Sequence, residues 1–346
     1  MSHALDMSNG RANMMYVGNV PWHGLGKYVG DNAVTAEEAI VAAGLDWSVG
    51  CQRVFAEYDK DGSHIELPNN YAVVRDDTKT VLGVVGNQYT PIQNTECFEF
   101  MDALAGPERL IRYHTAGSLH GGRKIWLLAE LTNLTFAPVP GDEVQPYLAL
   151  IDGKDGRTNL TAFFTGTRIV CQNTANYALG EAKKNGNKMV KIRHTPSAMG
   201  KIDEAKRVLG LAIDNAEVYA ETMKGLARKQ VNSAQWAELL DVLMPLPEVK
   251  DEEKPGRSWT MTNNKREKLN ELFETGVGTD IVGVRGTAWG AYNAVTEFTT
   301  HHARVNAGDK NAKDYKRRRA ERLLEASWFG SGDALNQKAL DLLIAA

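Results

Sequence analysis

The stretch YLALIDGKDGRTNLTAFF, residues 147–164, places a run rich in glycine and aspartate between two apolar segments. Short apolar runs bounded by such residues are typical of buried β-strands, and an Asp-Gly turn between two of them is typical of a hairpin. Upstream, a glycine-rich turn at 117–122 precedes a further apolar run. We therefore predict a central antiparallel meander. A helix is expected to leave it near Gln172, with Asn173 or Thr174 as its N-cap.

The chain before this meander shows strand patterns and two helix signals. Thr35-Ala-Glu-Glu forms a capping box, which predicts a helix over about 36–43. A second helix is expected from Thr95, with an apolar inner face. Strand patterns separated by turn sequences predict hairpins, and they occupy residues 46–58, 71–75 and 81–85.

Thr195-Pro196 predicts an N-cap followed by proline at the first helical position, and from there onward only helix patterns occur. A heptad stripe from Ile202 to Leu226 predicts a helix of roughly 30 residues. Packing against the chain's own helices is favoured over an oligomer seam, because the stripe lasts only about four heptads. Further helices are expected at 234–243, from Thr262 to Thr275, from Thr287, at 310–328 and from Asp333. The helix from Thr287 should bury one side, which carries Trp289, Tyr292, Val295 and Phe298.

Strands precede helices in this sequence instead of alternating with them, which favours the α+β class. We expect an antiparallel-sheet N-terminal domain followed by an all-helical C-terminal domain. The length of 346 residues agrees with about two domains. The predicted parts are a flexible N-terminus (1–20), a mixed α/β domain on an antiparallel sheet (21–182), a basic connector (183–195) and a helical domain (196–346).

Composition narrows the class of protein. A hydrophobic content of 43% and a charged content of 24% are ordinary for a soluble globular chain. We expect no membrane span, because no apolar run reaches about 18 residues, and no signal peptide, because the N-terminus is polar. The three isolated cysteines, Cys51, Cys97 and Cys171, predict buried thiols in a reducing compartment such as the cytoplasm.

Known catalytic and cofactor motifs are absent from the sequence, so no cofactor is expected. No glycine-rich phosphate loop lies between a strand and a helix, and no Cys or His pair has zinc-ligand spacing. Cys171 is a candidate nucleophile with His120 or His194 as its base. A buried thiol is favoured instead, because Cys171 closes the apolar run Ile169-Val170.

Positive charge is concentrated in the second half of the chain. Residues 1–150 carry 10 Lys and Arg against 18 Asp and Glu, a net charge of −8, whereas residues 151–346 carry 30 against 25, a net charge of +5. Residues 183–193 contain five cations and no acid, and residues 310–322 form a second basic cluster. Each basic cluster is either a solvent-exposed face or a surface that contacts successive phosphates of a nucleic acid.

Arg168 is a further candidate, because it stands at a strand end just before the expected helix. Such an arginine can bind a phosphate together with free backbone N–H groups, or it can form a structural salt bridge, and the sequence leaves both open. The candidate nucleic-acid-binding residues are therefore Arg168, Lys183, Lys184, Lys188, Lys191, Arg193, Lys316, Arg317, Arg318 and Arg319.

Several motifs resemble a known family. They are Pro21–Gly26, Leu82–Gly86 with Tyr89 and Gln93-Asn94, Arg168–Thr174 and Thr287–Phe298. These residues resemble the phage/plasmid-like family labelled domain of unknown function 932. The resemblance implies a mobile-element or prophage protein that acts in the cytoplasm of a bacterial host. It implies no reaction.

A remoter similarity is to Rad52-like single-strand annealing proteins. It rests on the order of a hairpin at 147–164 followed by a helix from about 172, without a matched annealing motif. The similarity implies a basic groove that holds single-stranded DNA, in a ring of identical subunits.

Three functions from different classes remain open. The first is a non-catalytic protein that binds or anneals single-stranded nucleic acid, and the basic clusters favour it. The second is an interaction protein that counters host defence or regulates mobile-element replication, and the net charge of −3 favours it. The third is an enzyme with an unrecognised site, which we favour least. The partners expected under the first hypothesis are single-stranded nucleic acid and further copies of the chain.

Overall fold

The structure of the protein is a computed structural model. It describes residues 5–8, 10–18, 25–31, 34–58, 62–105, 111–131, 134–168, 174–176, 189–201, 205, 218–249, 256–312, 315, 319, 322–323, 326 and 330–345. The chain divides into two compact units built from interleaved segments. Unit 1 comprises residues 1–133, 147–164 and 184–213, and unit 2 comprises residues 134–146, 165–183 and 214–346.

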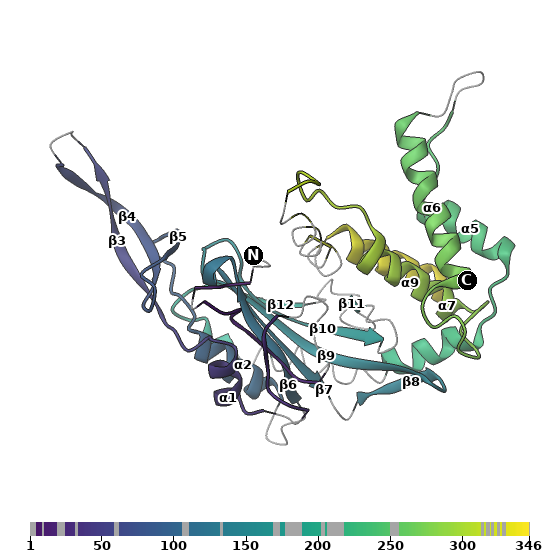
Figure 1. Ribbon diagram of the computed structural model, residues 1–346, viewed down its shortest axis with the longest axis horizontal. Coiled ribbons are helices and arrows are strands. Elements are labelled where there is room, and N and C mark those ends of the chain that lie inside the picture. The colour runs from purple at the N-terminus through teal and green to yellow at the C-terminus, as the bar shows by residue number, and fades with distance from the viewer. Residues whose placement is uncertain are drawn as a thin grey trace. The chain divides into compact units, whose positions relative to one another are not determined.

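Strands dominate the first half of the chain and helices the second, so the predicted α+β class is confirmed (Figure 1). The strands are β1 (Met14–Tyr16), β2 (Lys27–Tyr28), β3 (Val49–Glu57), β4 (His64–Arg75), β5 (Val81–Gly86), β6 (Ile111–Leu119), β7 (Lys124–Leu131), β8 (Phe136–Val139), β9 (Asp142–Gly153), β10 (Leu160–Arg168), β11 (Thr174–Asn176) and β12 (Met189–Ile192). The α-helices are α1 (Ala36–Ala42), α2 (Asn94–Ala105), α5 (Ser233–Leu243), α6 (Arg257–Thr275), α7 (Ala288–Glu297) and α9 (Ser331–Ala345). Two short 3₁₀ helices are η1 (His120–Gly122) and η3 (Met199–Lys201), and η4 (Phe298–His302) is a π-helix.

The main sheet has the strand order β11-β10-β9-β7-β6-β1-β2, with β12 paired to β10 and β8 paired to β9. Strands β6, β7 and β9 are joined by antiparallel ladders, as the predicted meander requires. In unit 1, alternate residues of β7 are buried, beginning with Ile125 and Leu127. The sheet therefore directs one row of apolar side chains into the core.

The two predicted helices of the first half are present. In α1, the Thr35 side chain accepts a hydrogen bond from the Glu38 backbone N–H, and the Glu38 side chain accepts one from the Thr35 N–H. In α2, Cys97, Phe98 and Met101 are buried, as its apolar face predicts. Local capping thus placed α1, and periodicity placed α2. Helix α2 begins at Asn94, so Thr95 lies inside it and the predicted start at Thr95 is one residue late.

A second sheet of unit 1 has the order β3-β4-β5. Strand β5 pairs only with Asn70–Val74 of β4, so the ends of β3 and β4 beyond Asn70 form a two-stranded ribbon. We call residues 52–58 and 63–70 the hairpin arm; Figure 1 shows the long β3–β4 ribbon. Nearly all described residues of this arm are exposed.

The helices of unit 2 follow the predicted order with shifted starts. Thr287 caps α7, and Trp289, Tyr292 and Val295 of that helix are buried as expected. Helix α6 begins at Arg257, whereas a start after Thr262 was predicted. No helix in the described part of the chain is long and apolar enough to span a membrane.

Two predicted helix starts are wrong. Thr174–Asn176 form strand β11, because their backbone groups pair with Thr165–Thr167 of β10 and tertiary pairing overrides the capping signal. At Thr195, the side chain hydrogen-bonds to the Ser197 hydroxyl (3.3 Å) and does not cap a helix, so turns and η3 follow instead. Most of the predicted helix over 196–226 lies outside the described residues, and the predicted domain boundaries remain predictions.

Candidate functional site

One group of buried charged and titratable side chains in unit 1 is formed by Asp152, Lys154 and His194, which we call the buried charge cluster. Asp152 lies near the end of β9 opposite Ile125, so the register of the sheet turns its side chain to the core face. Lys154 begins the following turn, and His194 follows β12 by two residues. The side chains of Asp152 and Lys154 are fully buried and that of His194 is 3% exposed.

Close packing explains why these charges are shielded from water. The turn after β9 lies against β5, and a Cβ atom on Gly83 would come within 2.6 Å of the Asp155 carbonyl oxygen. Tyr89 closes the other side, because its ring stacks on His194 with centroids 4.8 Å apart. The Tyr89 hydroxyl also donates a hydrogen bond to the Gly153 carbonyl oxygen (3.2 Å).

The cluster is internally paired. Lys154 Nζ lies 2.7 Å from Asp152 Oδ2 and also donates to the backbone carbonyl oxygen of Ile92. His194 Nε2 lies 3.1 Å from Asp152 Oδ1. The carboxylate is therefore held between one ammonium and one imidazole, which offsets the cost of burying it.

The pKa shifts fit a structural ion pair better than an acid–base catalyst. Burial by itself raises the pKa of Asp152, but the Lys154 ammonium and His194 outweigh burial and leave this pKa below its ordinary value. Burial lowers the pKa of Lys154, and the Asp152 carboxylate outweighs it and leaves that pKa raised. General acid–base catalysis works best with a pKa near the operating pH, and both groups move away from neutrality.

Strand β12 connects this cluster to the surface. Ile192 and His194 are buried, whereas Lys191 and Arg193 are exposed, as expected for successive residues of an extended chain. Residues of β12 pair on one side with β10, and Lys191 lies opposite Thr161. The buried cluster thus fixes the end of a strand segment whose outer face carries two cations.

The structure describes only some of the other residues that the sequence indicates as candidate nucleic-acid contacts or as a candidate nucleophile. Arg319 is half-buried and donates to the His301 carbonyl oxygen (3.3 Å), so part of its guanidinium is already used. Arg168 is the last residue of β10, and its side chain is not described. The residues outside the described part are Lys183, Lys184, Lys188, Lys316, Arg317, Arg318 and Cys171.

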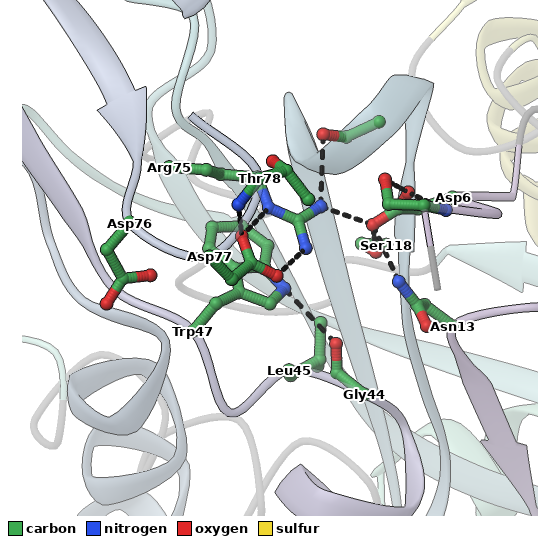
Figure 2. A network of polar contacts seen from close by, with 12 residues as sticks. Asp6, Asn13, Gly44, Leu45, Trp47, Arg75, Asp76, Asp77, Thr78 and Ser118 are labelled. Atoms are coloured by element: carbon green, nitrogen blue, oxygen red, sulfur yellow. Dashed lines mark hydrogen bonds and ion pairs between the residues drawn. The ribbon is translucent and has the colours of Figure 1, made fainter. Parts of the chain in front are cut away.

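A second buried network holds Arg75 in unit 1 (Figure 2). Its guanidinium pairs with Asp77 through Nε (2.8 Å) and Nη2 (2.6 Å), and Nη1 pairs with Asp6. The guanidinium also lies over the Trp47 ring, 4.2 Å from the centroid. Gly122, at a φ of +97°, completes the site, because a Cβ there would meet Arg75 Nη1 at 2.9 Å.

The Arg75 network fastens the N-terminal segment to the sheet. Asp6 also accepts hydrogen bonds from Asn13 (2.8 Å) and Ser118 (3.2 Å). Burial tends to raise the pKa of Asp6, but hydrogen bonds from Ser8, Arg75 and Asn13 outweigh it and lower this pKa. These contacts account for the buried charges without a ligand.

We expect Asp6→Asn to lower the free energy of unfolding by about 1–3 kcal/mol, because it removes a charged partner of Arg75. The matched control is Glu99→Gln at an exposed position of α2, which is expected to change stability by less than about 0.5 kcal/mol. Denaturant titration of both variants measures the difference. Equal stabilities would show that the Asp6–Arg75 contact does not hold the N-terminal segment.

No motif or spacing in the sequence points directly to either buried cluster. In the sequence, Asp152 and Lys154 have the pattern of turn residues, and His194 is a candidate only as a base for Cys171. The available signal was the alternation Leu150, Asp152, Lys154, which continues the core face of β9 with charged residues. Among the described residues, no group of three His, Cys, Asp or Glu side chains is placed to hold a metal ion.

Comparison with known proteins identifies a family. No curated protein and no solved structure matches the chain. A family model described as Domain of unknown function (DUF932) matches residues 81–328, which includes the buried charge cluster and β12 but not β3 or β4. Because this match covers more than half of the sequence, the chain belongs to the DUF932 family.

Proposed function

We propose that this protein is a non-catalytic nucleic-acid-binding protein of phage or plasmid origin that binds or anneals single-stranded DNA in the bacterial cytoplasm. The observation that carries the proposal is the exposed pair formed by Lys191 on β12 and Arg193 just after it. They continue the acid-free basic run that contains Lys183, Lys184 and Lys188. Adjacent cations without acids repel one another, and a polyanion relieves that repulsion.

The buried charge cluster supports this role by position. His194 follows Arg193 directly and is fixed by Asp152 and the Tyr89 ring. Its backbone carbonyl oxygen also accepts a hydrogen bond from the Thr90 N–H (3.1 Å). A strand end held in this way presents its exposed cations with little loss of conformational freedom on binding, which favours affinity.

If the proposal holds, the double variant Lys191→Ala/Arg193→Ala should lower the slope of log affinity against log salt by about 1.4, or about 0.7 for each lost phosphate contact. Lys183→Ala/Lys184→Ala should lower it by a similar amount. Arg168→Ala should weaken binding more than either single lysine change, because a fixed guanidinium orients one phosphate. Filter binding to a single-stranded oligonucleotide at several salt concentrations measures these slopes.

The matched control is Lys27→Ala, which removes an exposed cation from β2, elsewhere on unit 1. Its slope should equal that of the wild type, and every variant should keep the wild-type circular dichroism spectrum. A control that lowers the slope as much as the β12 variants would show diffuse charge attraction instead of a site. In that case the alternative proposal, an interaction protein that counters host defence or regulates replication, takes its place.

A further inference from the structure

The hairpin arm exposes apolar side chains that the rest of unit 1 does not cover. Phe55, Tyr58 and Ile65 are 53%, 68% and 51% exposed. Two-stranded hairpins without a third strand or a packed face are only marginally stable in water. An arm of this kind is therefore expected to gain stability from a partner.

The outer edge of β3 is available for such a partner. At its base, the Gln93 side chain bonds to both the N–H and the C=O of Val49, each at 3.0 Å. The Tyr58 N–H points the other way and donates to Ser63 on the opposite strand (2.8 Å). The β3–β4 ladder has a register irregularity between Arg53 and Phe55, so the direction of the backbone groups is counted from both ends. Alternation from Val49 directs those of Arg53 outward, alternation from Tyr58 does the same for Phe55 and Glu57, and no described strand pairs with these three residues.

The side chains on this edge are self-complementary. Arg53 lies over the Phe55 ring at 5.9 Å and pairs with Glu66 at 3.2 Å, so these residues share one face of the arm. Glu57 is two residues beyond Phe55 and lies on the same face. When two β3 strands pair antiparallel about Phe55, Arg53 of each copy lies opposite Glu57 of the other.

Neighbouring registers are less favourable. Pairing about Arg53 would place the two arginines opposite each other, and pairing about Glu57 would do the same for the two glutamates. Like charges directly opposite each other destabilise a strand pair, whereas opposite charges and aromatic pairs stabilise it. The charge pattern therefore selects the register centred on Phe55.

We propose that two copies of this chain associate through their hairpin arms, with the outer edges of β3 paired antiparallel about Phe55. Residues 53, 55 and 57 then exchange backbone hydrogen bonds with residues 57, 55 and 53 of the second copy. The pairing removes the exposed edge and covers the two Phe55 rings. It requires no nucleic acid, so its outcome is independent of the proposed function.

Charge exchange tests the register. Arg53→Glu and Glu57→Arg should each weaken association at least about tenfold. Each change replaces both Arg53–Glu57 attractions across the two-fold axis (the dyad) at Phe55 by repulsions between like charges. The double variant Arg53→Glu/Glu57→Arg should restore it. The matched control Arg53→Glu/Glu66→Arg restores the ion pair inside the arm but not the one across the dyad, and should stay weak.

Sedimentation velocity over a range of protein concentrations, without nucleic acid, measures these differences. The expected wild-type result is a concentration-dependent shift from monomer to dimer. A wild-type protein that remains monomeric throughout would overturn the proposal. So would a dimer that none of the charge variants weakens.

A cysteine at the dyad gives a second test that does not depend on affinity. Directly opposed hydrogen-bonded residues in antiparallel strands have Cα atoms about 5.5 Å apart, which a disulfide can span. In a Cys51→Ser background, Phe55→Cys should form a crosslinked dimer on mild oxidation. The control Tyr58→Cys, which is exposed but away from the dyad, should not; equal crosslinking of the two would contradict the register.

Discussion

Replacing Lys154 with methionine is expected to lower the free energy of unfolding by about 3–5 kcal/mol, because it leaves the buried Asp152 carboxylate without its cation. Lys154 Nζ lies 2.7 Å from this carboxylate, and both side chains are fully buried. The matched control is Lys224→Met, which removes an exposed ammonium 2.7 Å from Glu221 and should cost about 0–1 kcal/mol. Urea denaturation of the two variants provides the comparison.

A second substitution separates the lost charge from lost packing. Asp152→Leu combined with Lys154→Met replaces the ion pair by apolar side chains of similar size, and such exchanges are often neutral or stabilising. The double variant should therefore recover most of the stability lost in Lys154→Met. If it is less stable than the single variant, the cluster contributes through shape or through His194 instead of through charge.

The same cluster predicts a dependence of stability on pH. The pKa of Asp152 is lowered in the folded protein, so its contribution is complete above the unfolded value of about 4 and is lost as the pH falls toward the folded value. In Lys154→Met the burial of Asp152 is no longer opposed by the ammonium, which raises this pKa. Protonation then relieves the unpaired buried carboxylate, so Lys154→Met should lose less stability than the wild type as the pH falls below about 4. Parallel pH profiles of the two proteins would contradict this account.

Trp289→Ala is expected to cost about 3–5 kcal/mol, because the ring is only 2% exposed and its removal leaves a large cavity in unit 2. Its Nε1 also donates to Asp142 Oδ2 (2.7 Å). The control is Val282→Ala on the surface of the same unit, where the side chain is 90% exposed. Thermal unfolding measures both, and an unchanged melting temperature for Trp289→Ala would contradict the burial of the ring.

Trp289→Phe divides this effect into its parts. The phenyl ring fills much of the same volume, but it cannot donate to Asp142. We expect Trp289→Phe to lower the free energy of unfolding by about 1–3 kcal/mol, which is less than the effect of Trp289→Ala. Equal losses for the two substitutions would assign the whole effect to the hydrogen bond.

Local signals explain which parts of the fold could be predicted. Thr35 and Thr287 were identified as helix caps because the capping pattern depends on a few neighbouring residues. The buried stripe of α7 followed from its period. At Thr174 the same kind of signal failed, because pairing with β10, a distant element, decides the conformation.

The candidate site could be predicted only in part, because some of its features depend on neighbouring residues and others on contacts between distant elements. The alternation that exposes Lys191 and Arg193 is local, and the basic run was visible without a structure. The burial of Asp152 depends on the register between β7 and β9. Its pairing with His194 joins residues 42 positions apart, and no local pattern specifies such a contact.

The most direct test of the proposed function is a filter-binding titration of the wild-type protein with single-stranded and duplex DNA at 50 and 200 mM salt. If the five cations of residues 183–193 each contact a phosphate, single-strand affinity should fall by about 100-fold between these concentrations, from a slope of about 0.7 per contact. Single-stranded DNA should also bind more tightly than duplex at both concentrations. Absence of salt-dependent binding to either DNA, even at low ionic strength, would contradict the account.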